Sequence, residues 1–181
     1  MNFKSLIILF RRIKVLRYAN GDLLIKEGSS NNNVYFVRKG LVRSYVNDEQ
    51  GNEITFQLYP ESSVLTNVHF ILFKQSSRFN YEAIEDTKVY EIDYDSFVEV
   101  ASKSSELLEL NRTYFGKRII QGAFQRIESF VFLSPEERYK KYLNDYPSLV
   151  NRVPDKYIAN ILGITAVSLS RIRKRIANRK K

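Results

Sequence analysis

The chain has 181 residues and a formal net charge of +9, with 29 Lys and Arg against 20 Asp and Glu. This length fits one domain or two small ones and is sufficient for a hydrophobic core. Because cysteine is absent and His69 is the single histidine, disulfides, thiol chemistry, iron–sulfur clusters and multi-histidine metal sites are excluded, and no metal or cofactor is expected. The apolar run from Ser5 to Phe10 is far shorter than the ~20 residues of a membrane span, so the sequence predicts a soluble cytoplasmic protein without a membrane partner.

The positive charge is concentrated at the C-terminal end. Residues 135–181 hold 12 Lys and Arg against four Asp and Glu, a net charge of +8, whereas residues 1–134 hold 17 basic and 16 acidic residues. Such asymmetry indicates a segment that meets a polyanion, either nucleic acid or an anionic membrane. An ordinary solvated basic tail is the alternative.

The first ~95 residues have the pattern of β-strands. Apolar and polar residues alternate in 42–46, 54–58 and 88–92, and Asn-Gly and Lys-Gly turn signals separate such segments. Strands of this size, with turns every ~8–12 residues, indicate a compact antiparallel sandwich or barrel.

A long helix is predicted next, from residue 104 or 105 to about residue 133. Apolar residues recur along it at spacings of four and three, and a second apolar edge lies upstream. A helix that is apolar on more than one face needs two partners, its own domain and a second chain, so the sequence predicts a homodimer. Burial wholly within the monomer is the alternative. The residues expected at the dimer interface are Leu108, Phe115, Ile119, Ile120, Phe124 and Ile127.

A new helix is predicted from Pro135 to about Tyr146. Ser134 and Glu137 have the spacing of a capping box, and Pro135 occupies the first helical position. The long helix therefore ends just before Ser134, where the charge also changes.

The segment from 153 to 176 carries the most informative motif. Pro154 suits the start of a helix that Gly163 ends, and Thr165 suits the N-cap of a second helix. The second helix has apolar residues on one side and small polar and basic residues on the other. Two short helices joined by a glycine turn predict a helix-turn-helix, whose second helix enters the major groove of DNA. A basic helical hairpin without a ligand is the alternative.

The chain resembles the Crp/Fnr family of bacterial transcription regulators over nearly its whole length. The resemblance rests on residues 20–46 (NGDLLIKEGSSNNNVYFVRKGLVRSYV), 82–93 (EAIEDTKVYEID) and 152–176 (RVPDKYIANILGITAVSLSRIRKRI). It implies an α+β fold, with an antiparallel β-roll like the jelly roll of cyclic-nucleotide-binding domains. The expected parts are a β-roll sensor domain over 1–103, a long dimerisation helix over 104–133 and a helix-turn-helix domain over 134–181, without the β-hairpin wing that often follows.

The resemblance also implies the partners of the protein. They are a second copy of the chain, double-stranded DNA with a near-palindromic operator, RNA polymerase, and an unidentified small-molecule effector. No enzyme activity is expected, because the carboxylate pairs at 85–86 and 136–137 fall in a turn and a helix cap rather than beside other catalytic groups. The alternative function is a regulatory module of the cyclic-nucleotide-binding type without sequence-specific DNA binding.

Cyclic-nucleotide binders of this family carry Gly-Glu-Leu, whose acid meets the ribose, and then Arg-Ser/Thr-Ala, whose arginine meets the phosphate. In the matching stretch, 60–83, the Gly-Glu pair is replaced, and the arginine position falls on Ser77, with Arg78 one residue later. A shift of one residue in a strand turns a side chain to the opposite face, so we expect no dependence on a cyclic nucleotide. Ser76, Ser77 and Arg78 are the candidates for a pocket that takes another small molecule.

Within the second helix of the motif, Ala166, Val167 and Arg171 match the base-reading positions of the family. Arginine can bind guanine O6 and N7, and the two apolar residues can contact thymine methyl groups. Thr165, the expected N-cap, completes the start of this helix. The residues expected to contact DNA phosphates are Lys156, Tyr157, Ser168, Ser170, Arg173, Lys174 and Arg175.

Overall fold

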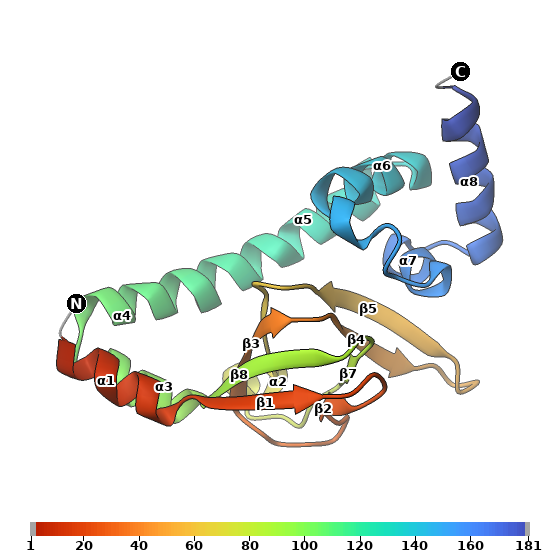
Figure 1. Ribbon diagram of the computed structural model, residues 1–181. Helices are drawn as coiled ribbons and strands as arrows, with labels where there is room; N and C mark the ends of the chain where they lie inside the picture. The colour runs from red at the N-terminus through yellow and green to blue at the C-terminus, as the bar shows by residue number, and fades with distance from the viewer. Residues whose placement is uncertain (1–2, 180–181) are drawn as a thin grey trace.

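The structure of the chain is a computed structural model. It describes the backbone of residues 3–179 and the side chains of these residues except at positions 3–6, 110, 114–116 and 118. The elements form a β-roll, a long helical segment that passes beside it, and a group of helices at the C-terminal end (Figure 1).

The β-roll consists of two four-stranded sheets in which every pair of neighbouring strands is antiparallel. The order in the first sheet is β1 (Lys14–Tyr18), β8 (Thr87–Asp93), β3 (Asn33–Lys39) and β6 (Val64–Thr66). The order in the second sheet is β2 (Leu23–Ile25), β7 (Asn80–Ala83), β4 (Val42–Asn47) and β5 (Glu53–Tyr59). The three strands predicted from alternating apolar residues are confirmed as β4, β5 and β8.

A hydrophobic core lies between the two sheets. Its buried members are Leu24, Ile25, Tyr35, Val37, Val42, Leu65, Tyr81, Ala83 and Val89. Buried and half-buried residues alternate along most of β8, as expected of a strand with one face on this core. β4 differs, because Val42, Arg43 and Ser44 are buried in succession. Both faces of β4 are therefore covered, one of them by the C-terminal helices.

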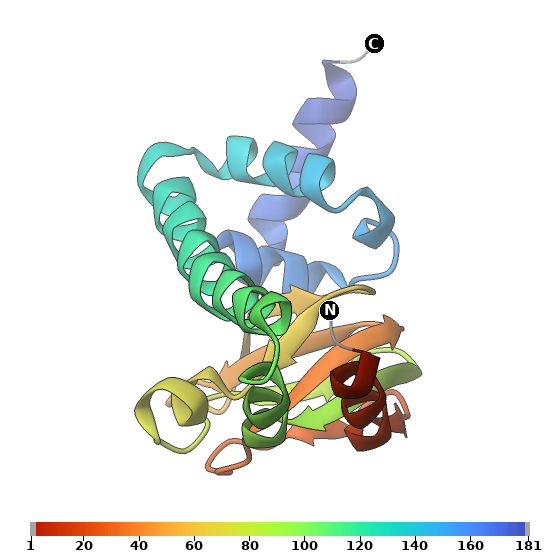
Figure 2. The same ribbon diagram turned by 90° about the vertical axis from the view of Figure 1, so that its left-hand side faces the viewer.

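Three short helices accompany the roll: α1 (Phe3–Arg12), α2 (Val68–Phe73) and α3 (Tyr94–Ala101). Helices α1 and α3 lie side by side below the long helical segment (Figure 2). Helix α2, which the residue pattern does not predict, lies within the stretch matched to the nucleotide cassette. Asn67 starts this helix, since its side-chain oxygen accepts a hydrogen bond of 3.2 Å from the backbone N–H of Phe70.

The predicted long helix is present, with one difference. It runs as α4 (Ser105–Asn111), a π-helical turn (Arg112–Lys117) and α5 (Arg118–Phe132), and Ser104 is its N-cap. The expectation of one regular α-helix is therefore wrong in detail. A π-helical turn accommodates more residues per turn than an α-helix, and it changes the direction in which the following side chains point.

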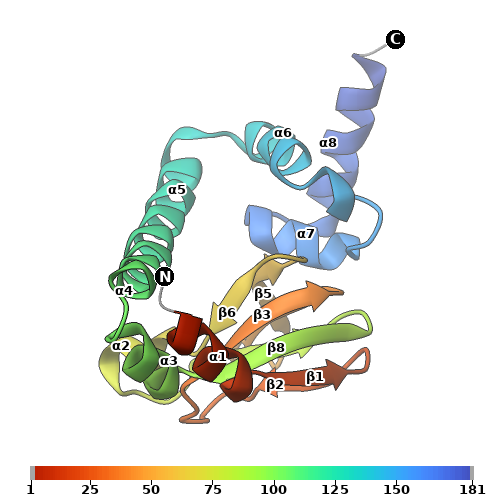
Figure 3. The ribbon, with the colours of Figure 1, turned by 60° about the vertical axis from the view of Figure 1, so that its left-hand side comes forward.

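The C-terminal helices are α6 (Pro135–Asp145), a 3₁₀ turn (Pro147–Leu149), α7 (Asp155–Leu162) and α8 (Ala166–Asn178). The predicted capping box is confirmed, because the Ser134 hydroxyl accepts from the Glu137 N–H and the Glu137 carboxylate accepts from the Ser134 N–H. Helix α7 lies against β5, and α8 projects away from the β-roll (Figure 3).

The C-terminal helices and the β-roll share a hydrophobic core. Leu41 and Leu58 of the roll are buried together with Ile158 of α7 and Leu169 of α8. The contact between the two parts of the chain is thus continuous and apolar at its centre. Nothing in the local sequence around these residues predicts it.

Candidate nucleic-acid interface

The turn between α7 and α8 is closed by Gly163. Its φ is +64°, a left-handed conformation that glycine adopts without steric cost. A Cβ atom at this position would lie 2.6 Å from Cε1 of Phe130 in α5. The predicted glycine turn is confirmed, and it also lies directly against the end of the long helix.

Helix α8 has one buried face and one exposed face. Leu169 and Ile172 are buried in the shared core. On the opposite side Val167 is 61% exposed, and Ala166, Ser170, Arg171 and Lys174 are exposed as well. The three predicted base-reading residues therefore lie on the exposed face, which a double helix could approach.

Arg173 is held inside the domain. Its Nη1 atom lies 2.7 Å from Oδ1 of Asp155, at the start of α7, and its Nε atom donates to the Tyr139 hydroxyl at 3.0 Å. These contacts connect α8 to α7 and α6. We expected a phosphate contact from Arg173, but in this structure its guanidinium supports the fold.

Arg175 takes part in an ion-pair cluster around Glu136. The side chain of Glu136 is 13% exposed. Its carboxylate lies 3.0 Å from Nη1 of Arg175, 2.8 Å from Nη1 of Arg179 and 2.9 Å from Nζ of Lys140. A hydrogen bond from Lys140 and the charges of the two arginines hold the pKa of Glu136 below its ordinary value. Part of the basic charge of the domain is therefore already neutralised, and Arg171 and Lys174 lie outside this cluster.

Of the remaining residues predicted to contact DNA, three lie at the start of α7 or α8 and one faces the β-roll. Thr165 and Ser168 form the start of α8, where the Thr165 hydroxyl accepts from the Ser168 N–H at 3.1 Å. Lys156 is exposed at the first turn of α7. Tyr157 is different, because its ring lies 4.1 Å from the guanidinium carbon of Arg43 in the β-roll. In this arrangement Tyr157 faces the roll rather than the surface next to α8.

An apolar stripe lies exposed on α5. Phe124 is 61% exposed, and its neighbours on the stripe are Ile120, Ile127 and Val131. Of the other residues expected at the interface, Leu108 is exposed, Ile119 is half-buried, and the side chain of Phe115 lies outside the described residues. Burial of the whole helix within one chain, which the sequence left open, is therefore not what the structure shows.

The three effector-pocket candidates do not converge on a common site. Ser77 is buried, and its hydroxyl donates to the Phe79 carbonyl at 2.7 Å. The hydroxyl of Ser76 lies 3.3 Å from that of Ser30, and Arg78 is exposed. These hydrogen bonds close a loop at the edge of the roll.

Tyrosine side chains occupy the interior of the β-roll. Tyr81 donates from its hydroxyl to the Thr66 carbonyl at 3.1 Å, and its ring lies 5.8 Å from that of Tyr59. Burial raises the pKa of Tyr35 to about 12, and it raises the pKa of Tyr81 as well. The phenols therefore stay neutral and hydrogen-bonded within the protein.

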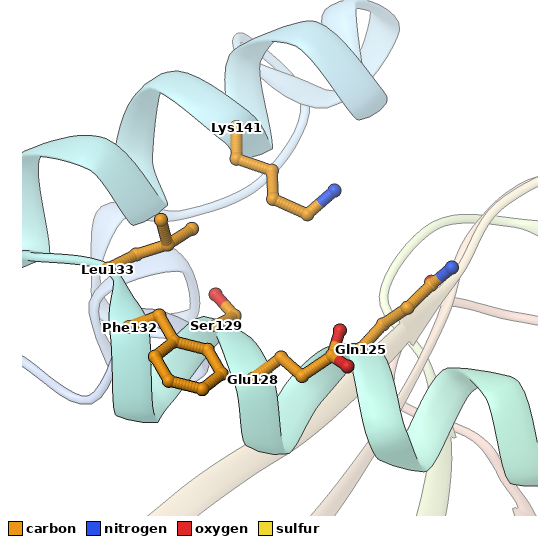
Figure 4. A pocket seen from close by; sticks show the side chains of 6 residues that line it. All are labelled: Gln125, Glu128, Ser129, Phe132, Leu133 and Lys141. Carbon is orange, nitrogen blue, oxygen red and sulfur yellow. The ribbon is translucent and has the colours of Figure 1, made fainter.

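Among the described residues, cavities lie at other places in the fold. One, of about 260 Å³, is at the elbow between α5 and α6 and is lined by Gln125, Glu128, Ser129, Phe132, Leu133 and Lys141 (Figure 4). The other, of about 310 Å³, is lined by Arg11, Arg12, Lys14, Asn33, Glu91, Ile92, Asp93 and Ser96.

Within residues 3–179, the acidic and histidine side chains form no cluster suited to a metal ion. In the same part of the chain, none of the helices has the length and hydropathy to cross a bilayer.

We expect titration calorimetry with cyclic AMP or cyclic GMP to show no binding tighter than ~1 mM, which corresponds to about 4 kcal/mol. The reason is that aliphatic and tyrosine side chains fill the interior of the roll, while Arg78 is exposed and the Ser77 hydroxyl is hydrogen-bonded to the Phe79 carbonyl. Adenosine 5′-monophosphate serves as the control for non-specific heats. A micromolar dissociation constant for either cyclic nucleotide would contradict this prediction.

Comparisons with known proteins agree with this architecture. Residues 15–104 match the family described as "Cyclic nucleotide-binding domain". FixK2 from Bradyrhizobium japonicum superposes with a TM-score of 0.75 at 19% identity, covering 93% of this chain and 86% of that one. The c-di-GMP responsive regulator CLP from Xanthomonas campestris has a TM-score of 0.71 at 13% identity, with 99% and 93% covered. A putative crp/fnr-family transcriptional regulator from Eubacterium rectale has a TM-score of 0.73 at 15% identity, with 99% and 85% covered.

At these identities the likeness establishes the fold. The α+β fold with an antiparallel β-roll and a C-terminal helical domain is confirmed, and with it the resemblance to Crp/Fnr regulators at the level of structure. Compared with curated proteins, the sequence has no match.

Proposed function

We propose that this chain is a homodimeric transcription regulator that binds specific DNA sequences. It shares the fold of Crp/Fnr regulators, and its residues 15–104 match the cyclic nucleotide-binding domain family. The observation that carries this proposal is the exposed face of α8. Arg171 and Lys174 are exposed on it, while Leu169 and Ile172 anchor the helix from the other side. An anchored helix with an exposed basic face suits the major groove of DNA.

The charge of the domain supports the same function. Residues 135–181 carry a net charge of +8. Exposed Lys156 and Lys174 would contact phosphates, which position a protein on DNA without specifying the sequence. Arg171 would read a guanine, and Ala166 and Val167 would contact thymine methyl groups.

The apolar stripe on α5 supports the dimer. Four large apolar side chains in a row along one helix form a patch that water solvates poorly, and a second copy of the stripe would cover it. A two-fold dimer would place its two copies of α8 about one DNA turn apart, roughly 34 Å, and would select a near-palindromic operator.

Two further parts of the proposal concern regulation. Because its own aliphatic and tyrosine side chains fill the interior of the roll, the protein would bind DNA without a cyclic nucleotide. Exposed surfaces of the dimer on DNA would then be available to RNA polymerase.

Arg171→Ala is expected to weaken operator binding by ~1–3 kcal/mol per half-site and to relax the preference at one base pair of each half. Lys174→Ala should weaken binding to all sequences about equally and reduce the dependence on salt, because a phosphate contact releases counterions. The measurement is binding to the operator and to scrambled DNA at two salt concentrations.

Lys141→Ala is the matched control, since it removes one exposed positive charge from α6, where Lys141 pairs with Asp145. If Arg171→Ala weakens both DNAs alike while Lys174→Ala alters base preference, the two roles are assigned wrongly. A gel shift with genomic fragments and excess non-specific competitor separates this function from a regulatory module without specific DNA binding. A module of that kind would retain no fragment.

A further inference from the structure

Arg43 of β4 is the largest of the fully buried side chains, with 1% of its surface exposed. Its Nε atom donates to Glu82 of β7 at 2.6 Å, and Nη2 donates to Glu53 of β5 at 2.6 Å. Nη1 lies 3.3 Å from the Thr55 hydroxyl. A buried guanidinium is tolerated only when such partners compensate for its lost hydration.

Two tyrosine rings cover the two faces of this guanidinium. The ring centroids of Tyr45 in β4 and Tyr157 in α7 each lie 4.1 Å from the guanidinium carbon of Arg43. The carboxylates fix the plane of the guanidinium, and this plane determines where a ring can stack on it. The Arg43 cluster, formed by Arg43, Glu53, Glu82, Tyr45 and Tyr157, therefore sets both the distance and the orientation of α7 relative to the roll, which an apolar contact alone would not do.

Polar contacts beside the cluster act in the same direction. Arg152, just before α7, lies 2.9 Å from a Glu61 oxygen and 2.7 Å from a Glu85 oxygen of the roll. Its guanidinium lowers the pKa of Glu61, so this pair stays charged well below neutral pH. Asn160 of α7 accepts a hydrogen bond of 3.2 Å from the Thr55 N–H.

The position of α7 determines that of α8, because the tight turn at Gly163 joins them. In this docked arrangement the exposed face of α8, with Arg171 and Lys174, is not covered by the roll. Docking is therefore compatible with DNA binding, and it fixes the place of α8 relative to the β-roll.

We infer that Arg43 and Tyr157 are positioning residues for DNA recognition. They hold each helix-turn-helix at one orientation on its β-roll, and so give the dimer a fixed distance between its two copies of α8 and a strict preference for one half-site spacing. The inference rests on the proposed function, but its first part, the fixed orientation, concerns the protein without DNA.

The first experiment measures that orientation. The natural chain has no cysteine, so spin labels can be attached at Glu49→Cys in the roll and Asn178→Cys on α8, both exposed positions. Labelled protein is diluted with unlabelled protein, so that double electron–electron resonance reports the distance between the two labels within one chain. We expect a narrow distribution for the parent protein and for Tyr157→Phe, which keeps the ring. Tyr157→Ala and Arg43→Met should broaden it. An unchanged distribution in Tyr157→Ala, which leaves the roll intact, would overturn the inference.

The second experiment measures spacing on operators with one, two or five base pairs inserted between the half-sites. The parent protein should lose ~100-fold in affinity when the spacing is wrong, because the second half-site is no longer engaged. Tyr157→Ala should distinguish the spacings by less than ~5-fold, with unchanged affinity for a single half-site. Equal weakening on every DNA would assign Tyr157 a purely structural role. A parent protein that binds no operator would refute the proposed function, while the distance measurement would still decide the orientation.

Discussion

The double substitution Ile120→Glu/Phe124→Glu is expected to convert the protein from a dimer to a monomer in sedimentation experiments. Both residues lie in the exposed apolar stripe of α5. In a dimer formed through this stripe, each new carboxylate would be buried without a partner, at a cost of several kcal/mol per charge. Four such charges per dimer should raise the dissociation constant by more than ~1,000-fold, which is about 4 kcal/mol.

Gln121→Glu/Gln125→Glu is the matched control. It adds the same charge to the same helix, at exposed positions that lie beside the stripe rather than in it. This variant should stay dimeric, and both variants should keep the helix content of the parent. If the stripe variant remains a dimer, the interface lies elsewhere on the chain.

Gly163→Ala is expected to lower the free energy of unfolding by about 2–5 kcal/mol. The left-handed backbone at φ +64° costs a residue with a Cβ about 1–2 kcal/mol. The new methyl group would also lie 2.6 Å from Cε1 of Phe130, and overpacking of this kind typically costs about 1–3 kcal/mol. Urea denaturation measures the loss.

Gly51 provides the control that separates the two contributions. Its φ is +80°, yet a Cβ there would meet no atom within 4 Å, so Gly51→Ala tests backbone strain alone. Adding Phe130→Ala to Gly163→Ala should remove the clash but not the strain. If Gly163→Ala is no more destabilising than Gly51→Ala, contact with Phe130 contributes nothing to the turn.

Elements whose signals are local could be predicted from the sequence alone. The capping box at Ser134, the N-cap at Thr165 and the turn at Gly163 were all predicted, because each depends on residues within one helical turn. The three alternating strands and the two faces of α8 were predicted for the same reason, since periodicity records which side of an element is apolar. The residues of the apolar stripe were likewise apparent from their spacing.

Which surfaces are covered follows instead from how the helices pack on the β-roll. Arg43 lies in an alternating strand where its sequence position indicates a solvent-facing side chain, yet it is buried because α7 docks over it. Tyr157 was predicted to contact phosphate and instead stacks on that arginine. Arg173 and Arg175 were predicted to contact phosphates, yet each is paired with an acidic residue that is distant in the chain, Asp155 and Glu136 respectively. Such contacts join residues that are far apart in sequence, so no local pattern records them. Only the docking of the helices on the β-roll shows which charges remain exposed.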